Sequence, residues 1–234
     1  TGCAYCINSN SFVFDNNKIY GTVEVQSLAT GYTTNDARIT NNYMEALDGA
    51  TTERALISVL MRNNAPRPKG TLISNNTLVI PYIHQMGMTI DTVDGAIVSN
   101  NTIRSTGNFT FYTGIEVVDS MDVVVNDNVV DLRTITSSPT QGINVNNSEY
   151  CTISDNNVTI FGPRVSSNYS MGIHLVSPGV SDKTDNNIVT DNIINIPTDA
   201  MGILVNTNAT DTTANRNMIR DNQIRVNSTA PSTL

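Results

Sequence analysis

Three polar side chains are candidates for acid, base or nucleophile chemistry in this 234-residue chain: Asp91, Glu116 and His174. Hydrolysis of a glycosidic bond needs one protonated and one ionised carboxyl group near that bond, which Asp91 and Glu116 would supply. A lyase or epimerase needs a base and a group that neutralises a uronate carboxylate, which Arg164 with His174 or His84 would supply. For each of the two histidines the alternative is an ordinary surface imidazole.

Aromatic, cationic and amide side chains are concentrated in insertions that precede one recurring segment of the chain. The insertions are 81–86, 107–113, 133–141 and 161–170. Sugars bind to flat apolar platforms combined with carboxylates and amides, and a long shallow surface suits a polymer. We therefore expect the following residues to bind a polysaccharide: Tyr82, His84, Tyr112, Asn144, Phe161, Arg164 and Tyr169. The alternative is that the aromatic residues only pack each insertion against the body of the protein.

The recurring segment begins with a small residue and continues with alternating apolar and polar positions. Its copies are 21–25, 55–59, 87–91, 114–118, 142–146, 172–176 and 202–206. A period of two in Val, Ile and Leu, bounded by turn-forming residues, predicts short strands and not helices. One outward column would contain Glu24, Ser58, Thr89, Glu116, Asn144, His174 and Leu204. The column beside it would contain Asp91, Val118, Asn146, Val176 and Asn206.

A second phrase returns once per repeat and centres on an asparagine between apolar residues. These asparagines are Asn10, Asn42, Asn76, Asn101, Asn128, Asn156, Asn192 and Asn222. A strand that recurs in constant register, without helices between the copies, pairs in parallel with the preceding copy. An inward Asn amide at each bend then bonds unpaired backbone groups and the equivalent Asn of the next coil. The prediction is an all-β, single-domain, right-handed parallel β-helix of about eight coils with an internal Asn ladder.

The repeat runs through the chain without a break in composition and so predicts one domain. We expect a frayed or truncated end over residues 1–6, the parallel β-helix over 7–226 and a C-terminal tail or linker over 227–234. A solenoid must cover its terminal coils, and neither end of the sequence shows a cap, so we also expect adjoining domains of a longer chain. Cys151 falls in an aliphatic column with Val123 and is predicted to lie in the core.

The charge of the chain opposes two classes of partner. Its net charge is −8, and its Lys and Arg residues form no basic stripe of the kind that binds nucleic acid. The same acidity disfavours attachment to an anionic membrane surface, and no apolar run is long enough to insert into one.

Four aspartates stand directly before ladder asparagines: Asp127, Asp155, Asp191 and Asp221. Stacked carboxylates at a bend would suit calcium. Asp also caps the backbone N–H groups of turns, which explains the column without a cation. The second interpretation is favoured, so no metal or other cofactor is predicted, and calcium is the alternative.

The segments 124–130 (VVNDNVV) and 152–158 (TISDNNV), each following a Gly-Ile-x-Val strand, resemble the repeat of the pectate-lyase-like superfamily. The resemblance covers nearly the whole chain and implies a right-handed parallel β-helix. Members include polysaccharide lyases, polygalacturonases, mannuronan epimerases, tailspikes and cell-surface proteins. The chain lacks the Asp-Asp, Gly-His-Gly and Arg-Ile-Lys motifs of polygalacturonases and the Asp-Pro-His motif of the epimerases. No catalytic residue is transferred, and any enzymatic activity would be that of a polysaccharide lyase or glycoside hydrolase.

Two functions fit these observations. The first is an extracellular, cell-surface or virion-associated module, tailspike-like or part of a carbohydrate-active protein, that binds a polysaccharide along its outward strand face and loops. The alternative is a structural rod or stalk, of surface-layer or adhesin type, without enzymatic activity. Because tailspike-like relatives are commonly trimers, the resemblance also implies a homotrimer as a candidate assembly.

Overall fold

A computed structural model describes residues 2–31, 33–46, 55–80, 86–106, 112–133, 140–161, 169–179, 183–207 and 214–227. Regular structure within these ranges consists of strands alone. No helix in this part of the chain could cross a membrane.

The strands form three parallel sheets, which we name A, B and C. Sheet A contains β1 (Gly2–Ile7), β3 (Lys18–Ser27), β6 (Ala55–Met61), β9 (Met86–Asp91), β12 (Tyr112–Val118), β15 (Thr140–Asn146), β18 (Met171–Ser177) and β21 (Met201–Thr207). Sheet B contains β2 (Val13–Asp15), β4 (Arg38–Thr40), β7 (Leu72–Ser74), β10 (Ile97–Ser99), β13 (Val124–Asn126), β16 (Thr152–Ser154), β19 (Ile188–Thr190) and β22 (Met218–Arg220). Sheet C contains the first half of β3, then β5 (Tyr43–Glu45), β8 (Thr77–Ile80), β11 (Thr102–Ser105), β14 (Val129–Arg133), β17 (Asn157–Phe161), β20 (Ile193–Pro197) and β23 (Gln223–Asn227).

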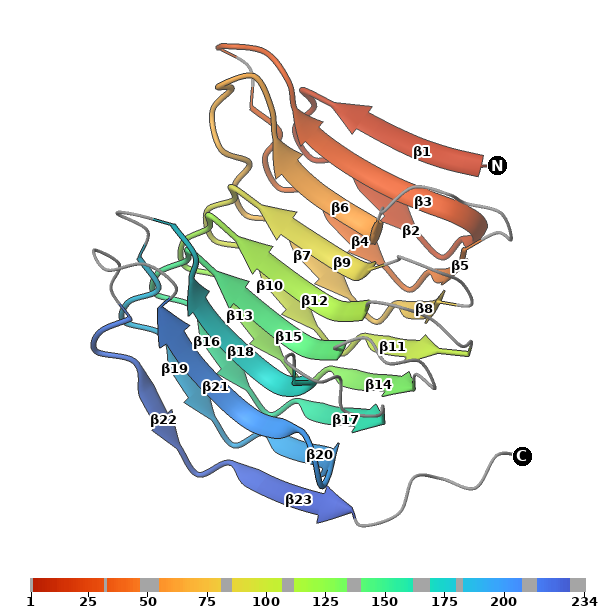
Figure 1. Cartoon of the computed structure of the whole chain (residues 1–234). Helices are drawn as coiled ribbons and strands as arrows, with labels where there is room; N and C mark the ends of the chain where they lie inside the picture. Colours follow the sequence, from red (N-terminus) through yellow and green to blue (C-terminus); the bar gives the residue numbers. More distant parts are fainter. Residues whose placement is uncertain are drawn as a thin grey trace.

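Each turn of the chain visits the three sheets in the same order. Every strand pairs in parallel with the equivalent strand of the next turn, so the 8-stranded sheet B takes one strand from each turn. Figure 1 shows the strands stacked along one axis, with β1 and β23 at opposite ends. The protein is a right-handed parallel β-solenoid, as the repeat predicts.

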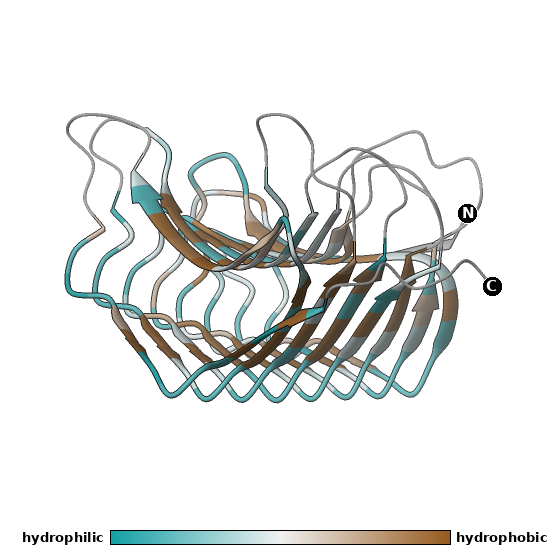
Figure 2. Ribbon diagram, turned by 60° about the horizontal axis from the view of Figure 1, so that its bottom comes forward, coloured by the Kyte–Doolittle hydropathy of each residue, from teal (hydrophilic) through white to brown (hydrophobic). Residues whose placement is uncertain are grey.

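The core consists of aliphatic columns inside the coil. Met88, Ile115, Ile143 and Ile173 occupy equivalent positions on consecutive strands of sheet A, and all four are fully buried. Cys151 is also fully buried, and burial raises the pKa of its thiol to about 12, which confirms the prediction of a core residue. Figure 2 shows hydrophobic residues along the strands and hydrophilic residues at the bends. The short strands thus bury their apolar side chains only by stacking turn on turn.

A ladder of asparagine amides runs along the bends between sheets B and C. Each Nδ2 group donates to the Oδ1 atom of the asparagine in the next turn, over distances between 2.8 and 3.1 Å. The same side chains bond backbone groups, as when Asn128 Nδ2 donates to Val98 O at 2.9 Å. The members are Asn17, Asn42, Asn76, Asn101, Asn128, Asn156, Asn192 and Asn222.

The first member of the ladder differs from the prediction. Asn17 donates to Asn42, whereas the predicted Asn10 is exposed and accepts a bond from Asn35 N at 3.1 Å. The true first copy of the phrase has Phe14 where the later copies have Ile or Val, so the aliphatic pattern did not detect it.

The N-terminal end also differs from the prediction. The sequence predicts a frayed or truncated end over residues 1–6, but β1 is not frayed, because it pairs along its whole length with β3, from Gly2 against Gly21 to Ile7 against Gln26. Cys6 is buried because it lies in the column of Val25. Residues 2–6 therefore belong to a strand of the solenoid, and the signal for it is a Gly-led alternation made from Ala and Cys in place of larger aliphatic residues.

The aspartate column has a conformational cause. Asp127, Asp155, Asp191 and Asp221 all have φ values between 55° and 57°, in the left-handed region that Asn and Asp tolerate better than other non-glycine residues. The described residues contain no group of three or more His, Cys, Asp or Glu side chains that could hold a metal ion. The four aspartates thus suit the backbone conformation of the bend, and calcium binding stays a prediction.

Candidate functional site

The outward face of sheet A has the side-chain columns that the sequence predicts. Register pairs place Glu116 beside Asn144 and Asn144 beside His174, on β12, β15 and β18. The column is Tyr5, Glu24, Ser58, Thr89, Glu116, Asn144, His174 and Leu204, of which Tyr5 was not predicted. The neighbouring column is Gln26, Leu60, Asp91, Val118, Asn146, Val176 and Asn206. The strands thus bring candidate residues from distant parts of the sequence into one surface.

The centre of this face is less open than expected. Asn144, His174 and Val176 are only 5%, 7% and 5% exposed, which contradicts a shallow solvent-facing surface. Glu116 and Asp91 keep intermediate exposure. The period of two determines which side of a strand a residue takes, but not whether other parts of the protein cover that side.

Two carboxylates lie on adjacent strands of this face in different columns. Asn144 Nδ2 lies 3.4 Å from Glu116 Oε1, and the Thr92 hydroxyl donates to Asp91 Oδ1 at 2.7 Å. Burial raises the pKa of Glu116, the Asn144 amide opposes the shift, and the charge of Asp91 adds to it. Burial also raises the pKa of Asp91. Each carboxyl group thus holds its proton to higher pH than it would in water, as a general acid requires.

His174 is held as a neutral imidazole by burial and by Gln141. Gln141 Nε2 lies 3.2 Å from Nδ1, and Asn206 Oδ1 lies 2.8 Å from Nε2, so Nδ1 accepts while Nε2–H donates. Burial lowers the pKa of His174, and the bond to Asn206 opposes that shift. The expected surface imidazole is therefore wrong for His174. Its ring supplies no positive charge to the face at neutral pH.

We expect His174→Gln to make the fold less sensitive to acid. The pKa of His174 is held below its ordinary value of 6.5, so below pH 6.5 the unfolded chain binds a proton that the folded chain does not. Stability from this group is complete above that pH and is lost as the pH falls through the folded-state pKa. Urea midpoints measured between about pH 7 and pH 5 should fall more for the wild type than for the variant.

The other histidine, His84, is present in both proteins and cancels from this comparison. Glu116 and Asp91 act in the opposite direction, because raised carboxyl pKa values make the folded state gain stability as the pH falls. Equal losses of stability in the wild type and in His174→Gln would show that His174 is not the group that responds to the fall in pH.

The structure describes only some of the other residues that were predicted to bind a polysaccharide. Tyr112 is the first residue of β12, and Tyr169 is half-buried two residues before β18. Phe161 ends β17 in sheet C, where the Arg133 guanidinium lies 5.3 Å from its ring centre. Tyr82, His84 and Arg164 lie outside the described residues. The polysaccharide role of all these residues stays a prediction.

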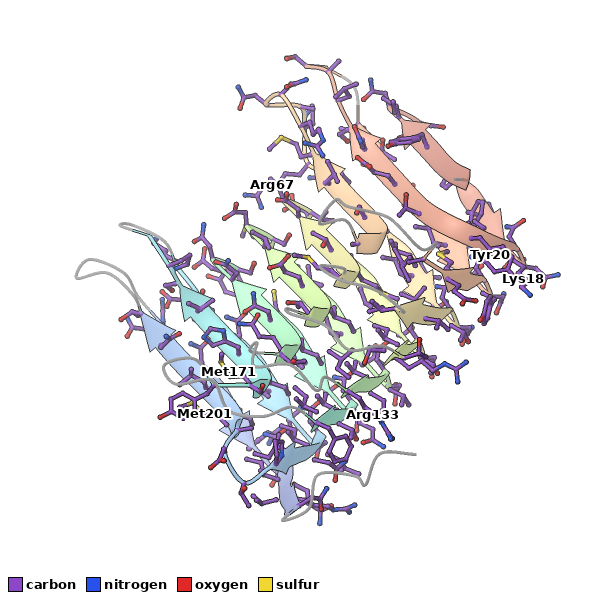
Figure 3. The ribbon with its side chains drawn as sticks, turned by 45° about the vertical axis from the view of Figure 1, so that its right-hand side comes forward. Lys18, Tyr20, Arg67, Arg133, Met171 and Met201 are labelled. Atoms are coloured by element: carbon purple, nitrogen blue, oxygen red, sulfur yellow. The ribbon has the colours of Figure 1, made fainter. Side chains whose placement is uncertain are left out.

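Several residues of this face were not assigned a role from the sequence. Gln141 and Asn206 orient His174, and the buried Thr113 lies beside Gln141 in a third outward column. Met171 and Met201 continue that column on β18 and β21, as Figure 3 shows. The register of the Gly-led strands would have identified all of them, because Thr113, Gln141, Met171 and Met201 each lie one residue before the strand glycine and Asn206 lies four residues after one.

A hollow of about 420 Å³ opens elsewhere, at the bends between sheets A and B. Its lining residues are Lys69, Gly70, Asp94, Gly95, Met121 and Asp122. Arg67, labelled in Figure 3, and Lys69 form ion pairs with Asp94 at 3.2 and 3.8 Å. The charges in this hollow therefore compensate one another, in contrast to those on sheet A.

Comparison with known structures concerns the fold. A surface protein and adhesin of Streptococcus pneumoniae, PfbA, is 12% identical, with a TM-score of 0.51 over 94% of this chain and 66% of that one. The likeness is one of fold. A second PfbA structure has a TM-score of 0.42, with 61% of that chain covered, and the A-module of the Azotobacter vinelandii mannuronan C-5 epimerase AlgE6 has a TM-score of 0.26 at 12% identity, over 98% of this chain and 88% of that one. No family model and no curated protein matches the sequence.

The chain spans less than two thirds of both PfbA structures. A TM-score above one half with PfbA is consistent with the parallel β-solenoid that the sheet register shows.

Proposed function

We propose that this chain is an extracellular or virion-associated solenoid module that binds polysaccharide along the outward face of sheet A. The observation that carries the proposal is the polar centre of that face, where Glu116, Asn144 and His174 lie side by side and two of them are almost fully buried. Burying such groups costs stability, and apolar residues would cover a sheet more favourably. Polar groups kept out of water at such a cost are typical of binding sites.

The surroundings of the face support a sugar ligand. Carboxylate, amide and imidazole groups lie next to the thioethers of Met171 and Met201, so hydrogen-bonding and apolar surfaces adjoin. Sugars present this combination of hydroxyl groups and C–H faces. The fold is shared with PfbA, described as a surface adhesin, which agrees with a location at a cell or virion surface.

A glycan array probed with the chain tests the proposal, with release of reducing ends assayed on each polymer that binds. Asn144→Ala should weaken binding by about tenfold or more, because it removes an amide from the centre of the face. Asn195→Ala is the matched control, since Asn195 contacts Thr159 on sheet C at 3.1 Å. The control should bind as the wild type does. Binding to no glycan on the array would refute the proposal.

A structural rod is the second candidate, and the stacking of equivalent strands along one axis, without a break among the described turns, favours it. A homotrimer stays a prediction, which sedimentation equilibrium tests. If the chain binds no glycan on the array, the structural function becomes the better supported of the two.

A further inference from the structure

We infer that the centre of sheet A binds an uncharged, hydroxyl-bearing saccharide and rejects carboxylated or sulfated ones. The inference rests on the proposed function and adds the charge class of the ligand. It follows from two independent features of the face, which are hydrogen-bond acceptors without donors and an excess of negative charge.

The first feature is a set of unpartnered oxygen atoms. Asn144 Oδ1, Asn146 Oδ1 and Thr113 Oγ1 have no hydrogen-bond partner and are shut off from solvent. Asn144 and Thr113 are 5% and 0% exposed, and the Nδ2 group of Asn144 lies against the Glu116 carboxylate. Buried acceptors in native proteins are nearly always paired, directly or through an ordered water. A ligand that supplies hydroxyl donors, or holds a water there, completes the site.

The second feature is the charge of the strands. β9, β12, β15, β18 and β21 have the sequences MGMTID, YTGIEVV, TQGINVN, MGIHLVS and MGILVNT, with no Lys or Arg among them. Two carboxylates, Asp91 and Glu116, lie on this surface. His174 is neutral because Gln141 Nε2 donates to its Nδ1 atom, which leaves that nitrogen without a proton, while Nε2–H donates to Asn206. The described strands at the centre of sheet A are therefore purely acidic.

A cation near this face is already engaged. Arg62, which follows β6, forms an ion pair with Glu24 at 3.7 Å. Glu24 lies three strand pairings from Glu116 in the same column, by way of Ser58 and Thr89, which is roughly 14 Å at ordinary strand spacing. The charge of Arg62 also lowers the pKa of Asp91, so Arg62 offsets both Glu24 and Asp91, and an anionic ligand at Glu116 would still meet an excess of like charge.

Hydroxyl groups suit the same surface. They donate to Glu116 and to the free amide oxygens without adding charge, and a sugar C–H face can lie on the half-buried Met201. A uronate in place of the neutral sugar would bring a carboxylate beside Glu116 with no cation on these strands to pair with it. The expected preference for the neutral sugar is therefore electrostatic, because repulsion by Glu116 weakens the binding of the carboxylated sugar.

Three matched pairs of polymers test the inference: glucan and polyglucuronate, galactan and polygalacturonate, mannan and polymannuronate. Within each pair the linkage is kept and only C6 changes from hydroxymethyl to carboxylate. In the pair that binds, the neutral member should bind at least about tenfold more tightly, as measured by isothermal titration calorimetry. Added salt should leave the affinity for the neutral member unchanged, because no ion pair forms.

Glu116→Gln keeps the acceptor oxygen and removes the charge, so the ratio of neutral to carboxylated affinity should fall by at least about threefold. Glu149→Gln, in the bend after β15, makes the same change of net charge away from the face and should leave the ratio as in the wild type. Thermal unfolding checks that both variants fold.

Equal or tighter binding of the carboxylated member overturns the inference and leaves the proposed function intact. Binding on the wider array only to carboxylated or sulfated glycans does the same. Binding to no glycan at all refutes the proposed function, and the inference falls with it.

Discussion

Asn128→Ala will lower the free energy of unfolding by about 3–5 kcal/mol, the largest effect expected from a single polar substitution in this chain. Asn128 Oδ1 accepts from both the backbone N and the side-chain Nδ2 of Asn101, at 3.0 Å each. Its Nδ2 group donates to Val98 O at 2.9 Å and to Asn156 Oδ1 at 3.0 Å. All of these groups are buried, so the substitution leaves several of them without partners. Urea unfolding followed by circular dichroism measures the loss.

Asn10→Ala is the matched control, because the sequence phrase assigns Asn10 to the same ladder and the structure does not. Asn10 is exposed and makes one bond, to Asn35 N. Its replacement should cost less than about 1 kcal/mol. If the two substitutions cost the same, the buried ladder does not hold the turns together.

Gly114→Ala is expected to cost about 3 kcal/mol, through steric crowding and not through loss of a bond. A Cβ atom at this position would lie 2.5 Å from Val130 Cγ1 and 2.6 Å from Gly142 O. The second of these atoms belongs to the backbone of the adjacent strand, so the clash is relieved only by moving the turns apart. The thermal midpoint should fall accordingly.

Gly95→Asn provides the comparison for this prediction. Gly95 has a φ of 68°, and no heavy atom lies within 4 Å of the place where its Cβ would be. The equivalent residue of the next turn is Asp122, with a φ of 55°, so the bend accepts a side chain. Asn tolerates this conformation, and a change of less than about 1 kcal/mol is expected. A loss as large as that of Gly114→Ala would argue against crowding as the cause.

The crowding at Gly114 bears on the candidate site as well as on stability. The small residue lets β12 approach β15 closely, and Glu116 follows it by two residues on the outward side. A shift of these strands would also move Glu116 relative to Asn144. The glycine column thus belongs to the framework that positions the site.

Much of this architecture could be predicted from local patterns. The period of two places Glu116, Asn144 and His174 on the same side of their strands, and one strand per turn brings them into one column. The Asn phrase predicts the ladder wherever an aliphatic residue precedes it. The first turn was missed because Phe14 fills the aliphatic position, which an aromatic ring can do as well.

The chemical state of the candidate site could not be predicted in the same way. His174 looks like a lone histidine in the sequence, yet Gln141 and Asn206, 33 and 32 residues away, fix which of its nitrogens carries the proton. The raised pKa of Glu116 comes from burial and from Asp91 on the adjacent strand. Such effects depend on distances between turns, and no local pattern contains them.

By itself, the sequence determined the class of fold, the strand register and the membership of the outward columns, because each follows from a repeat and from side-chain alternation within one strand. Only the tertiary structure decided which of those outward residues are buried, which nitrogen of His174 donates, and which oxygens beside Glu116 lack a partner. The physical reason is that burial and hydrogen bonding depend on groups that stacking brings together from separate turns, whereas alternation depends only on the geometry of a single strand.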